Sequence, residues 1–328
     1  MIRFLLRRLL HAGILIFVVV TASFFIIKFA PGDPLTRYYS PAIDPAAMDL
    51  VRRQMGLEDP LPIQYLKTMR SFLVGNFGMS TSEYRPVSAI LAEAIPRTLI
   101  LTGTALLIQV LLGVALGMLS AARRHGILDR ALSLFFLVLY SIPSFYLAFI
   151  LVAFFSLKLG YLPSASMYSL QVGDGIWDVV RDRAAHMVLP VAVLALGSAA
   201  SLARFTRGSL LDVIRKDYVQ TARAKGVTEG KIMRRHVFKN ALPEILTVVG
   251  LSVPILLGGA VVVEKVFAWP GMGSLVVDSI FARDYPVILA VNFVGACMVV
   301  LGNLLADVSY YFVDPRIKLP TGSEPVSG

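Results

Sequence analysis

Residues 226–232 carry side chains that could hold a phosphate group. They read Gly-Val-Thr-Glu-Gly-Lys-Ile. A phosphate-binding loop likewise has two glycines, then a lysine, then a serine or threonine that binds magnesium. Here three residues separate the glycines instead of four, and Ile232 takes the place of the magnesium ligand. No strand is predicted before this stretch, so we expect it not to bind ATP.

Side chains suited to metal binding or acid–base catalysis are scattered along the chain. The histidines occur singly, with no second His, Cys or carboxylate at ligand spacing, at His11, His125, His186 and His236. No Ser/His/Asp set and no carboxylate pair falls on a shared helix face. We therefore expect no metal site, no cofactor site and no catalytic residues, which makes a membrane-anchored enzyme a weak hypothesis.

The composition indicates that lipid surrounds most of the chain. Hydrophobic residues make up 56% of the 328 residues and charged residues only 16%, whereas about a quarter of a soluble domain is charged. A compact globule could not bury that much apolar surface. The net charge of +10 could indicate nucleic-acid binding, but basic cytoplasmic loops explain it, and their distribution favours that explanation.

Six apolar stretches are long enough, or nearly so, to cross a hydrocarbon core, which takes about 20 helical residues. We place them at residues 9–30, 98–122, 131–157, 187–203, 245–263 and 287–306. None alternates as a β-barrel strand does, so the predicted fold class is an all-α integral membrane protein with six transmembrane helices. The first stretch is longer than the apolar run of a signal peptide and is expected to remain as an anchor.

The basic residues predict the orientation. Lys and Arg gather before the first span, after the second span and above all in residues 204–243, whereas 31–96, 158–186 and 264–286 do not lean basic. Because Lys and Arg stay on the cytoplasmic side, we expect the N- and C-termini and the 204–243 loop to be cytoplasmic. The predicted location is the inner (cytoplasmic) membrane, in a multi-pass topology.

These spans predict four parts, which are an N-terminal transmembrane helix (1–30), a small extracytoplasmic subdomain (31–96), a five-helix core (97–310) and a cytoplasmic tail (311–328). Within the core, kinks or broken turns are expected at residues 141–144 and 254–259, because proline removes a helical hydrogen bond. No internal duplication is visible between the two halves.

The basic loop 204–243 holds the most informative pattern. Tyr218 to Lys225 predicts a short helix that Gly226 ends, since glycine readily takes the left-handed conformation. Thr228 could cap the helix that follows.

The small side chains of this short helix indicate a docking surface. Val219 and Ala222 share one face, flanked by Thr221 and Ala224, and another protein's groove could close around them. The alternative is a solvated basic loop on anionic lipid. Such a loop would not need small residues followed by a helix-ending glycine, so we favour docking.

Gln220-Thr221-Ala222 followed by Gly226 resembles the Glu-Ala-Ala…Gly (EAA) motif of ABC importer permeases, in the version of the dipeptide/oligopeptide/nickel permease family. The resemblance continues along nearly the whole chain, at residues 7–10, 31–34, 56–65, 76–78, 85–87, 267–273, 283–286 and 314–316. It implies a type I ABC importer permease-like fold. It also implies a transport subunit, not an enzyme, for peptides or alternatively for nickel or a metal chelate.

The resemblance implies the partners as well. They are a second homologous permease, two ATPase subunits that hold ATP and Mg, and an extracytoplasmic substrate-binding protein, with membrane lipid around the bundle and no nucleic acid. In that family the loop is a coupling helix seated on the ATPase, whose closure switches the bundle between two states. The coupling residues implied are Tyr218, Val219, Gln220, Thr221, Ala222, Ala224 and Gly226.

Two positions depart from the family pattern. Gln220 replaces the glutamate of the motif, which keeps its length and hydrogen bonding but not its charge. The usual Leu-Pro would fall at residues 238–239, whereas Leu242-Pro243 follows about one helical turn later, which suggests a slightly longer helix into the fifth span.

The last outer loop allows two interpretations. Trp269, Pro270, Gly271 and Gly273 form either an interfacial aromatic anchor with a turn or, by the resemblance, an outer gate or binding-protein contact. Polar residues within or near the spans also have two possible roles, because they could line a pathway or form interhelical hydrogen bonds. Those singled out are Ser141, Ser144, Ser252 and Asn292.

An ATP-independent carrier or channel is the remote alternative. Ionisable residues inside the spans would favour it, but only Lys28 and Asp307 come near, and both are close to span ends. The substrate stays open at this point, because the motifs do not distinguish peptides from nickel or other small solutes.

Overall fold

The computed structural model describes residues 2–30, 50, 52–53, 56–124, 126–173 and 175–313. In this part of the chain the regular secondary structure is helical, apart from an isolated bridge between Met79 and Pro86. The elements are α1 (Ile2–Phe29), α3 (Leu61–Leu73), α4 (Val87–Ala122), α5 (Ile127–Ser141), α6 (Ser144–Leu151), the π-helix η2 (Val152–Lys158), α7 (Ile176–Ile214), α8 (Asp217–Ala224), α9 (Glu229–Lys231), the π-helix η3 (Ile232–Phe238), α10 (Lys239–Val266), α11 (Met272–Ala282) and α12 (Tyr285–Val313).

Four of the described helices are long and apolar enough to cross a membrane, within α1, α4, α7 and α12. A fifth candidate is the broken pair formed by α5 and the α6–η2 segment. These five agree with five of the predicted spans. The sixth, 245–263, lies within the 28-residue helix α10, and the count of six spans stays a prediction.

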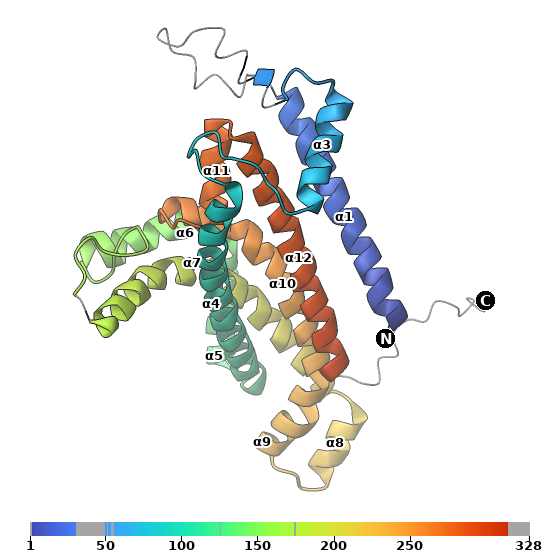
Figure 1. The fold of residues 1–328 in the computed structure, drawn as a ribbon. Coiled ribbons are helices and arrows are strands. Elements are labelled where there is room, and N and C mark those ends of the chain that lie inside the picture. Colours follow the sequence, from blue (N-terminus) through green and yellow to red (C-terminus); the bar gives the residue numbers. More distant parts are fainter. Residues whose placement is uncertain are drawn as a thin grey trace.

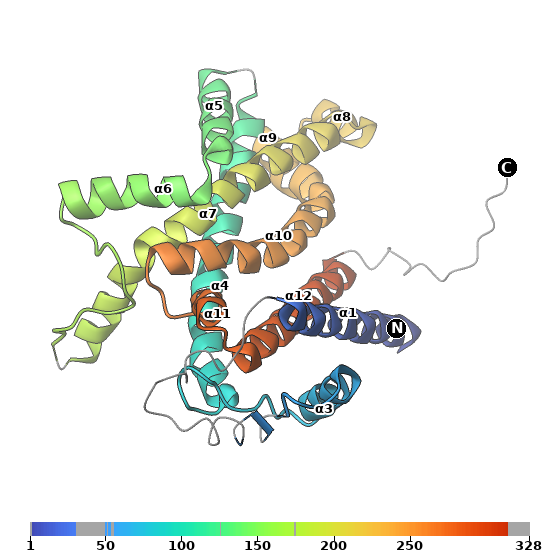
Figure 2. The same cartoon turned by 90° about the horizontal axis from the view of Figure 1, so that it is seen from above.

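The break expected at residues 141–144 is confirmed. Ile142 is extended, Pro143 precedes the first residue of α6, and the two helices meet at an angle of 105°. The second expected break is absent as a change of secondary structure, because α10 continues through Pro243 and Pro254. Its axis curves instead (Figure 2), which neighbouring helices in a bundle can support.

Helices α4 and α7 cross at the centre of the molecule (Figure 1). Two glycines permit the close approach. A Cβ atom on Gly113 would lie 2.9 Å from the side chain of Leu202, and one on Gly117 would lie 2.7 Å from the carbonyl oxygen of Ala203. This is the close-packing role of small residues in helix pairs. Their contact holds the bundle around which the other helices are arranged.

Two helices extend beyond their predicted spans. Helix α4 begins at Val87, so residues 87–96, assigned to the extracytoplasmic subdomain, are the first turns of a core helix. Helix α7 covers Ile176–Ile214 and takes in the first part of the predicted loop 204–243. In both places polar residues continue a helix past the end of its apolar run. Residues 31–49 and the tail 314–328 lie outside the described residues, so the subdomain and the tail stay predictions.

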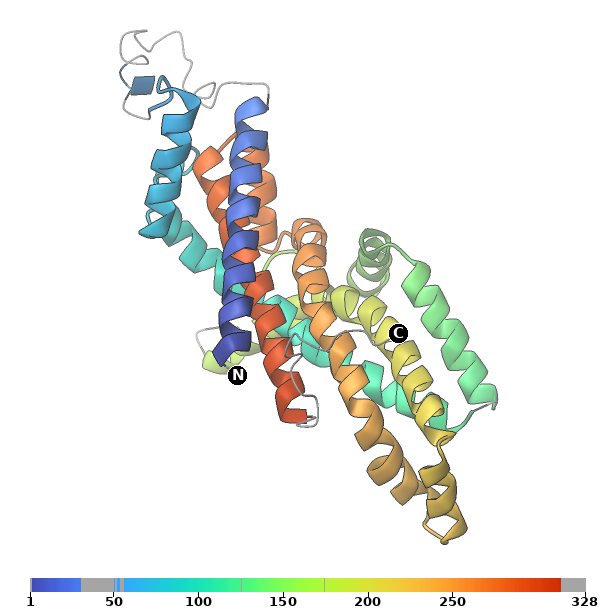
Figure 3. The same ribbon diagram turned by 90° about the vertical axis from the view of Figure 1, so that its right-hand side faces the viewer.

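Helix α1 lies at the edge of the bundle (Figure 1) and runs alongside α12 (Figure 3). Helix α3 packs on α1 through an edge-to-face contact of Phe24 with Tyr65, and the Tyr65 hydroxyl is 2.8 Å from that of Thr21. Helices α8 and α9 lie at one end of the molecule, whereas α3 and α11 lie toward the other (Figure 1).

Candidate functional site

Helix α8 ends as the sequence predicts. It covers Asp217–Ala224, and Gly226 follows with a φ of +78°. The Gly226 amide donates to the Arg223 carbonyl at 3.0 Å, and the Val227 amide donates to the Ala222 carbonyl at 3.2 Å. These two bonds form a Schellman motif, which satisfies carbonyl groups at the helix end. The turn therefore has one defined backbone geometry.

The face of α8 that is exposed is not the face that the sequence analysis expected. Val219 and Ala222 are 0% and 8% exposed, and they pack into an apolar cluster with Ile214, Ile232 and Val237. The expectation that these two side chains face a partner is wrong, because they attach α8 to its own chain. The exposed residues of the predicted set are Tyr218, Gln220, Thr221, Ala224 and Gly226.

Polar side chains tie the exposed face of α8 to the next helix. Arg223 donates to both carboxylate oxygens of Glu229, at 2.5 and 3.1 Å, and to Oε1 of Gln220 at 3.0 Å. The hydrogen bond from Arg223 lowers the pKa of Glu229. Gln220 also donates from Nε2 to the Ile214 carbonyl at 3.3 Å. An amide can accept and donate at once, whereas an ionised glutamate can only accept, so Gln220 supports a bond that the glutamate of the family motif could not make.

The chain continues from the turn into α10 without interruption. Thr228 is the N-cap residue of α9, as expected. Its carbonyl accepts from the amides of Lys231 and Ile232, whereas its side chain makes no capping hydrogen bond. Residues 229–266 are helical throughout, through α9, η3 and α10. This confirms the longer helix expected at the start of the fifth span. Residues 229–266 thus form one continuous helical rod, which begins at the turn after α8.

An ion pair at the same end of the bundle was not expected from the sequence. Asp129 of α5 is only 4% exposed and receives a bidentate interaction from Arg207 of α7. Ser120 of α4 donates to the same carboxylate at 2.5 Å. The three side chains join three helices. A single acidic residue in the basic stretch 123–130 was the one signal in the sequence that could have indicated this pair.

The loop of residues 267–273, which the sequence predicts to be the last outer loop, packs against the protein interior. Trp269 is 0% exposed, and its Nε1 donates to the Arg97 carbonyl at 3.1 Å. It is therefore neither an interfacial anchor nor an accessible partner contact, and both expectations are wrong for this side chain. Pro270 is half-buried, and Gly271 and Gly273 are buried. An outer gate formed by this loop stays a prediction.

Glu264 follows the predicted fifth span (245–263) directly, and its carboxylate is buried beneath these glycines. Glu264 is 0% exposed, accepts from the Thr98 hydroxyl at 2.6 Å and accepts from the Ser274 amide at 3.0 Å. A Cβ on Gly271 would clash with Glu264 Oε1, and one on Gly273 would lie 2.5 Å from the Cα atom of Val261. The absence of side chains at these two glycines therefore lets the loop pack directly against α4 and α10.

The four pathway candidates do not come together. Ser252 accepts from Gln109 Nε2 at 2.8 Å, and Asn292 donates to Ser23 Oγ at 3.0 Å, so both form the interhelical hydrogen bonds that were the other possible role. Ser141 donates to the Leu137 carbonyl beside the helix break, and Ser144 is exposed there.

An apolar groove lies between α4, α10 and α12. Its volume is about 660 Å³, and hydrophobic side chains such as Leu106, Val253 and Val294 form most of its lining. None of the four pathway candidates lines it. The hydropathy of the individual spans could not predict this groove, because the groove is formed by the packing of three helices that are distant in the sequence.

The described part of the chain contains no group of three or more His, Cys, Asp or Glu side chains that could hold a metal ion. The phosphate-loop-like stretch 226–232 forms the turn and the start of the helical rod that follow helix α8.

Two family models match the chain. Residues 113–319 match "Binding-protein-dependent transport system inner membrane component", and residues 1–102 match "Binding-prot-dependent transport system membrane comp, N-term". The chain belongs to this family of binding-protein-dependent transport system inner membrane components. It is a multi-pass protein of the inner membrane and a transport subunit.

Individual relatives cover the chain almost completely. It is 39% identical over 319 residues to the oligopeptide transport system permease protein AppB of Bacillus subtilis (strain 168), covering 97% of this chain and 100% of that protein. It is 38% identical over 318 residues to the glutathione transport system permease protein GsiC of Salmonella paratyphi A, covering 97% and 99%. Among solved structures, an inward-facing MetNI methionine ABC transporter matches with a TM-score of 0.55 at 20% identity, covering 69% of this chain and 97% of that one. The last likeness concerns the fold alone.

Proposed function

We propose that this chain is a permease subunit of an ATP-driven ABC importer that carries peptides across the cytoplasmic membrane. The full-length similarity to permeases named for oligopeptide and glutathione transport supports this substrate class. Nickel or a metal chelate is the alternative cargo, supported only by the sequence resemblance.

The proposal rests on the two faces of α8. Its inner face is fixed by Val219 and Ala222, and its outer face carries Tyr218, Gln220 and Thr221 at the end of the bundle. An anchored helix with a free face suits a docking element, because binding then orders few additional side chains. The partners we propose are a second homologous permease, two ATPase subunits that hold ATP and Mg, and an extracytoplasmic substrate-binding protein.

The rod formed by α9, η3 and α10 offers a route for the coupling. It starts at Glu229, which Arg223 ties to α8, and extends to Val266 beside the outer loop. Two-state switching of packed helices requires an element that moves as a unit. A shift of α8 on closure of the ATPases would therefore move α10 relative to α4 and α12.

The proposed topology has six membrane spans, with both termini and α8 in the cytoplasm. The α1–α4 connection and the loop before α11 are then extracytoplasmic. The placement of α8 at the end of the molecule opposite α3 and α11 supports this arrangement (Figure 1).

Reconstitution with the partner subunits tests the proposal. We expect ATP-dependent uptake of a labelled oligopeptide into proteoliposomes. Deletion of residues 220–226, or Thr221→Arg on the exposed face, should abolish copurification of the ATPase and uptake together. The matched control is Asn240→Arg, an exposed position at the start of α10. Full uptake and ATPase binding by the deletion variant would contradict the proposal, and uptake of labelled nickel in place of peptide would select the alternative cargo.

A further inference from the structure

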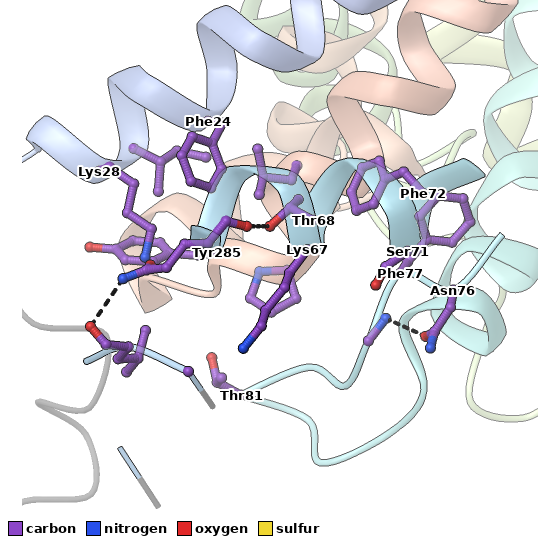
Figure 4. Close-up of a pocket in the computed structure, with 17 residues that line it drawn as sticks. Phe24, Lys28, Lys67, Thr68, Ser71, Phe72, Asn76, Phe77, Thr81 and Tyr285 are labelled. Atoms are coloured by element: carbon purple, nitrogen blue, oxygen red, sulfur yellow. Dashed lines mark hydrogen bonds between the residues drawn. The ribbon is translucent and has the colours of Figure 1, made fainter. Parts of the chain in front are cut away.

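A second pocket lies between α1, α3 and the start of α12, outside the lining of the apolar groove. Its volume is about 280 Å³. Its apolar lining includes Phe24, Ile27 and Leu289. Lys28, Lys67 and the hydroxyl group of Thr68 contribute to its polar part (Figure 4). The pocket is thus amphipathic, with its apolar side on the membrane helices.

Among the described residues, the charged side chains that line this pocket are both cations, Lys28 and Lys67. Lys67 pairs with Asp59 at 2.6 Å. Lys28 is half-buried with its ammonium group 5.9 Å from the ring centre of Phe24, and no acidic side chain pairs with it in the described part of the chain. A half-buried cation of this kind is stabilised by a bound anion.

The position of the pocket indicates where the anion comes from. Helix α1 lies at the edge of the bundle (Figure 1), and on the face that flanks Lys28 it exposes Phe25 and Phe29, at 36% and 74%. Lys28 is in the last turn of this candidate span. Lysines at span ends extend to the membrane interface, where lipid phosphates lie.

We propose that this pocket binds the phosphate group of an anionic phospholipid, with Lys28 as its principal contact and the acyl chains along the face of Phe25 and Phe29. The polar part of the pocket suits a headgroup, and the exposed apolar face beside it suits the chains. The lipid would thereby join α1, α3 and α12, which meet at this pocket.

Photoactivatable phosphatidylglycerol tests the site in nanodiscs that contain the full-length chain and an excess of phosphatidylcholine. We expect cross-links in residues 24–29 and 64–72. Lys28→Gln should reduce them about five-fold, which corresponds to about 1 kcal/mol for one lysine near anionic lipid. Lys28→Arg keeps the charge and should retain them, which separates loss of binding from loss of folding.

Lys158→Gln is the matched control, since Lys158 also ends a membrane helix and lies 5.6 Å from the ring centre of Phe154, outside the pocket. It should leave these cross-links unchanged. Inorganic phosphate in millimolar excess should not displace the lipid, and displacement would mean that the site takes free phosphate instead. Equal cross-linking of the Lys28→Gln variant and the unmodified chain, or of phosphatidylcholine and phosphatidylglycerol probes, would overturn the proposal.

Discussion

Asp129 and Arg207 lie 78 positions apart in the chain and form a two-point ion pair. Arg207 Nε lies 2.7 Å from Asp129 Oδ1, and Nη2 lies 2.8 Å from Oδ2. The pair joins α5 to the end of α7 that leads into α8. Because α5 lies before the 105° break, this contact fixes the first half of the broken helix pair against α7.

Removal of one partner of this pair should be costly. Asp129→Asn leaves Arg207 partly buried without its counter-ion, and we expect a loss of about 3 kcal/mol in the free energy of unfolding. The double variant Asp129→Asn/Arg207→Gln should recover part of that loss, because no unpaired charge remains. Thermal unfolding in detergent measures both. Arg215→Gln, at an exposed arginine, is the control, and an Asp129→Asn variant as stable as this control would contradict the assignment.

Gly226 should be required for its conformation and not for its size. Its φ of +78° is strained for other residues, and a Cβ at this position would meet no atom within 4 Å. We expect Gly226→Ala to destabilise the turn by about 1–2 kcal/mol. Hydrogen exchange at the amides of Gly226 and Val227, which form the Schellman motif, measures this.

The control is Gly230→Ala, in helix α9, where a Cβ also meets no atom within 4 Å and φ is not positive. Alanine should stabilise that position by up to about 1 kcal/mol. Equal protection of the turn amides in both variants would show that the left-handed conformation does not matter.

The turn after α8 should weaken in acid. Arg223 lowers the pKa of Glu229 below its ordinary value of 4.5. The folded turn therefore binds fewer protons than the unfolded chain, so its stabilisation is complete above about pH 4.5 and is lost as the pH falls through the folded pKa. Hydrogen exchange of residues 226–231, corrected for intrinsic rates, should show this loss below pH 4.5. Glu229→Gln should abolish the pH dependence, and an unchanged dependence in that variant would assign it to another group.

The outer loop should not tolerate a side chain at Gly273. A Cβ there would meet the backbone of Val261 at 2.5 Å, which cannot move aside as a flexible side chain can. We expect Gly273→Ala to cost about 1–3 kcal/mol in the free energy of unfolding. Gly295→Ala in α12, where nothing lies within 4 Å, is the control, and a thermal shift assay compares the two. An unchanged unfolding temperature for Gly273→Ala would mean that the loop is open.

Local patterns predicted the parts of this fold that local physics determines. Continuous apolar runs predicted the positions of five spans, and Pro143 predicted the position of the break between α5 and α6. Gly226 predicted where α8 ends. The same runs could not give the helix ends, because α4 and α7 continue through polar residues from Val87 and Ile176.

Contacts between distant segments were not predictable in this way. The pairing of Glu264 with Thr98 spans 166 positions, and neither residue belongs to a periodic pattern. The inward face of α8 is likewise set by the cluster around Ile232 and Val237, which comes from the following helix. Periodicity showed that Val219 and Ala222 share a face, but not which way that face points.

Two neighbouring residues of α8, one exposed and one buried, allow the most direct measurement of docking. Thr221 is exposed and Ala222 is 8% exposed. In a Cys297→Ser background, Thr221→Cys and Ala222→Cys each carry one thiol, and a thiol-to-amine cross-linker is applied to the complex with the ATPase subunits. A cross-linked product with the ATPase from Thr221→Cys but not from Ala222→Cys is the predicted result. No product from Thr221→Cys, or equal products from both, would contradict docking through the exposed face of α8.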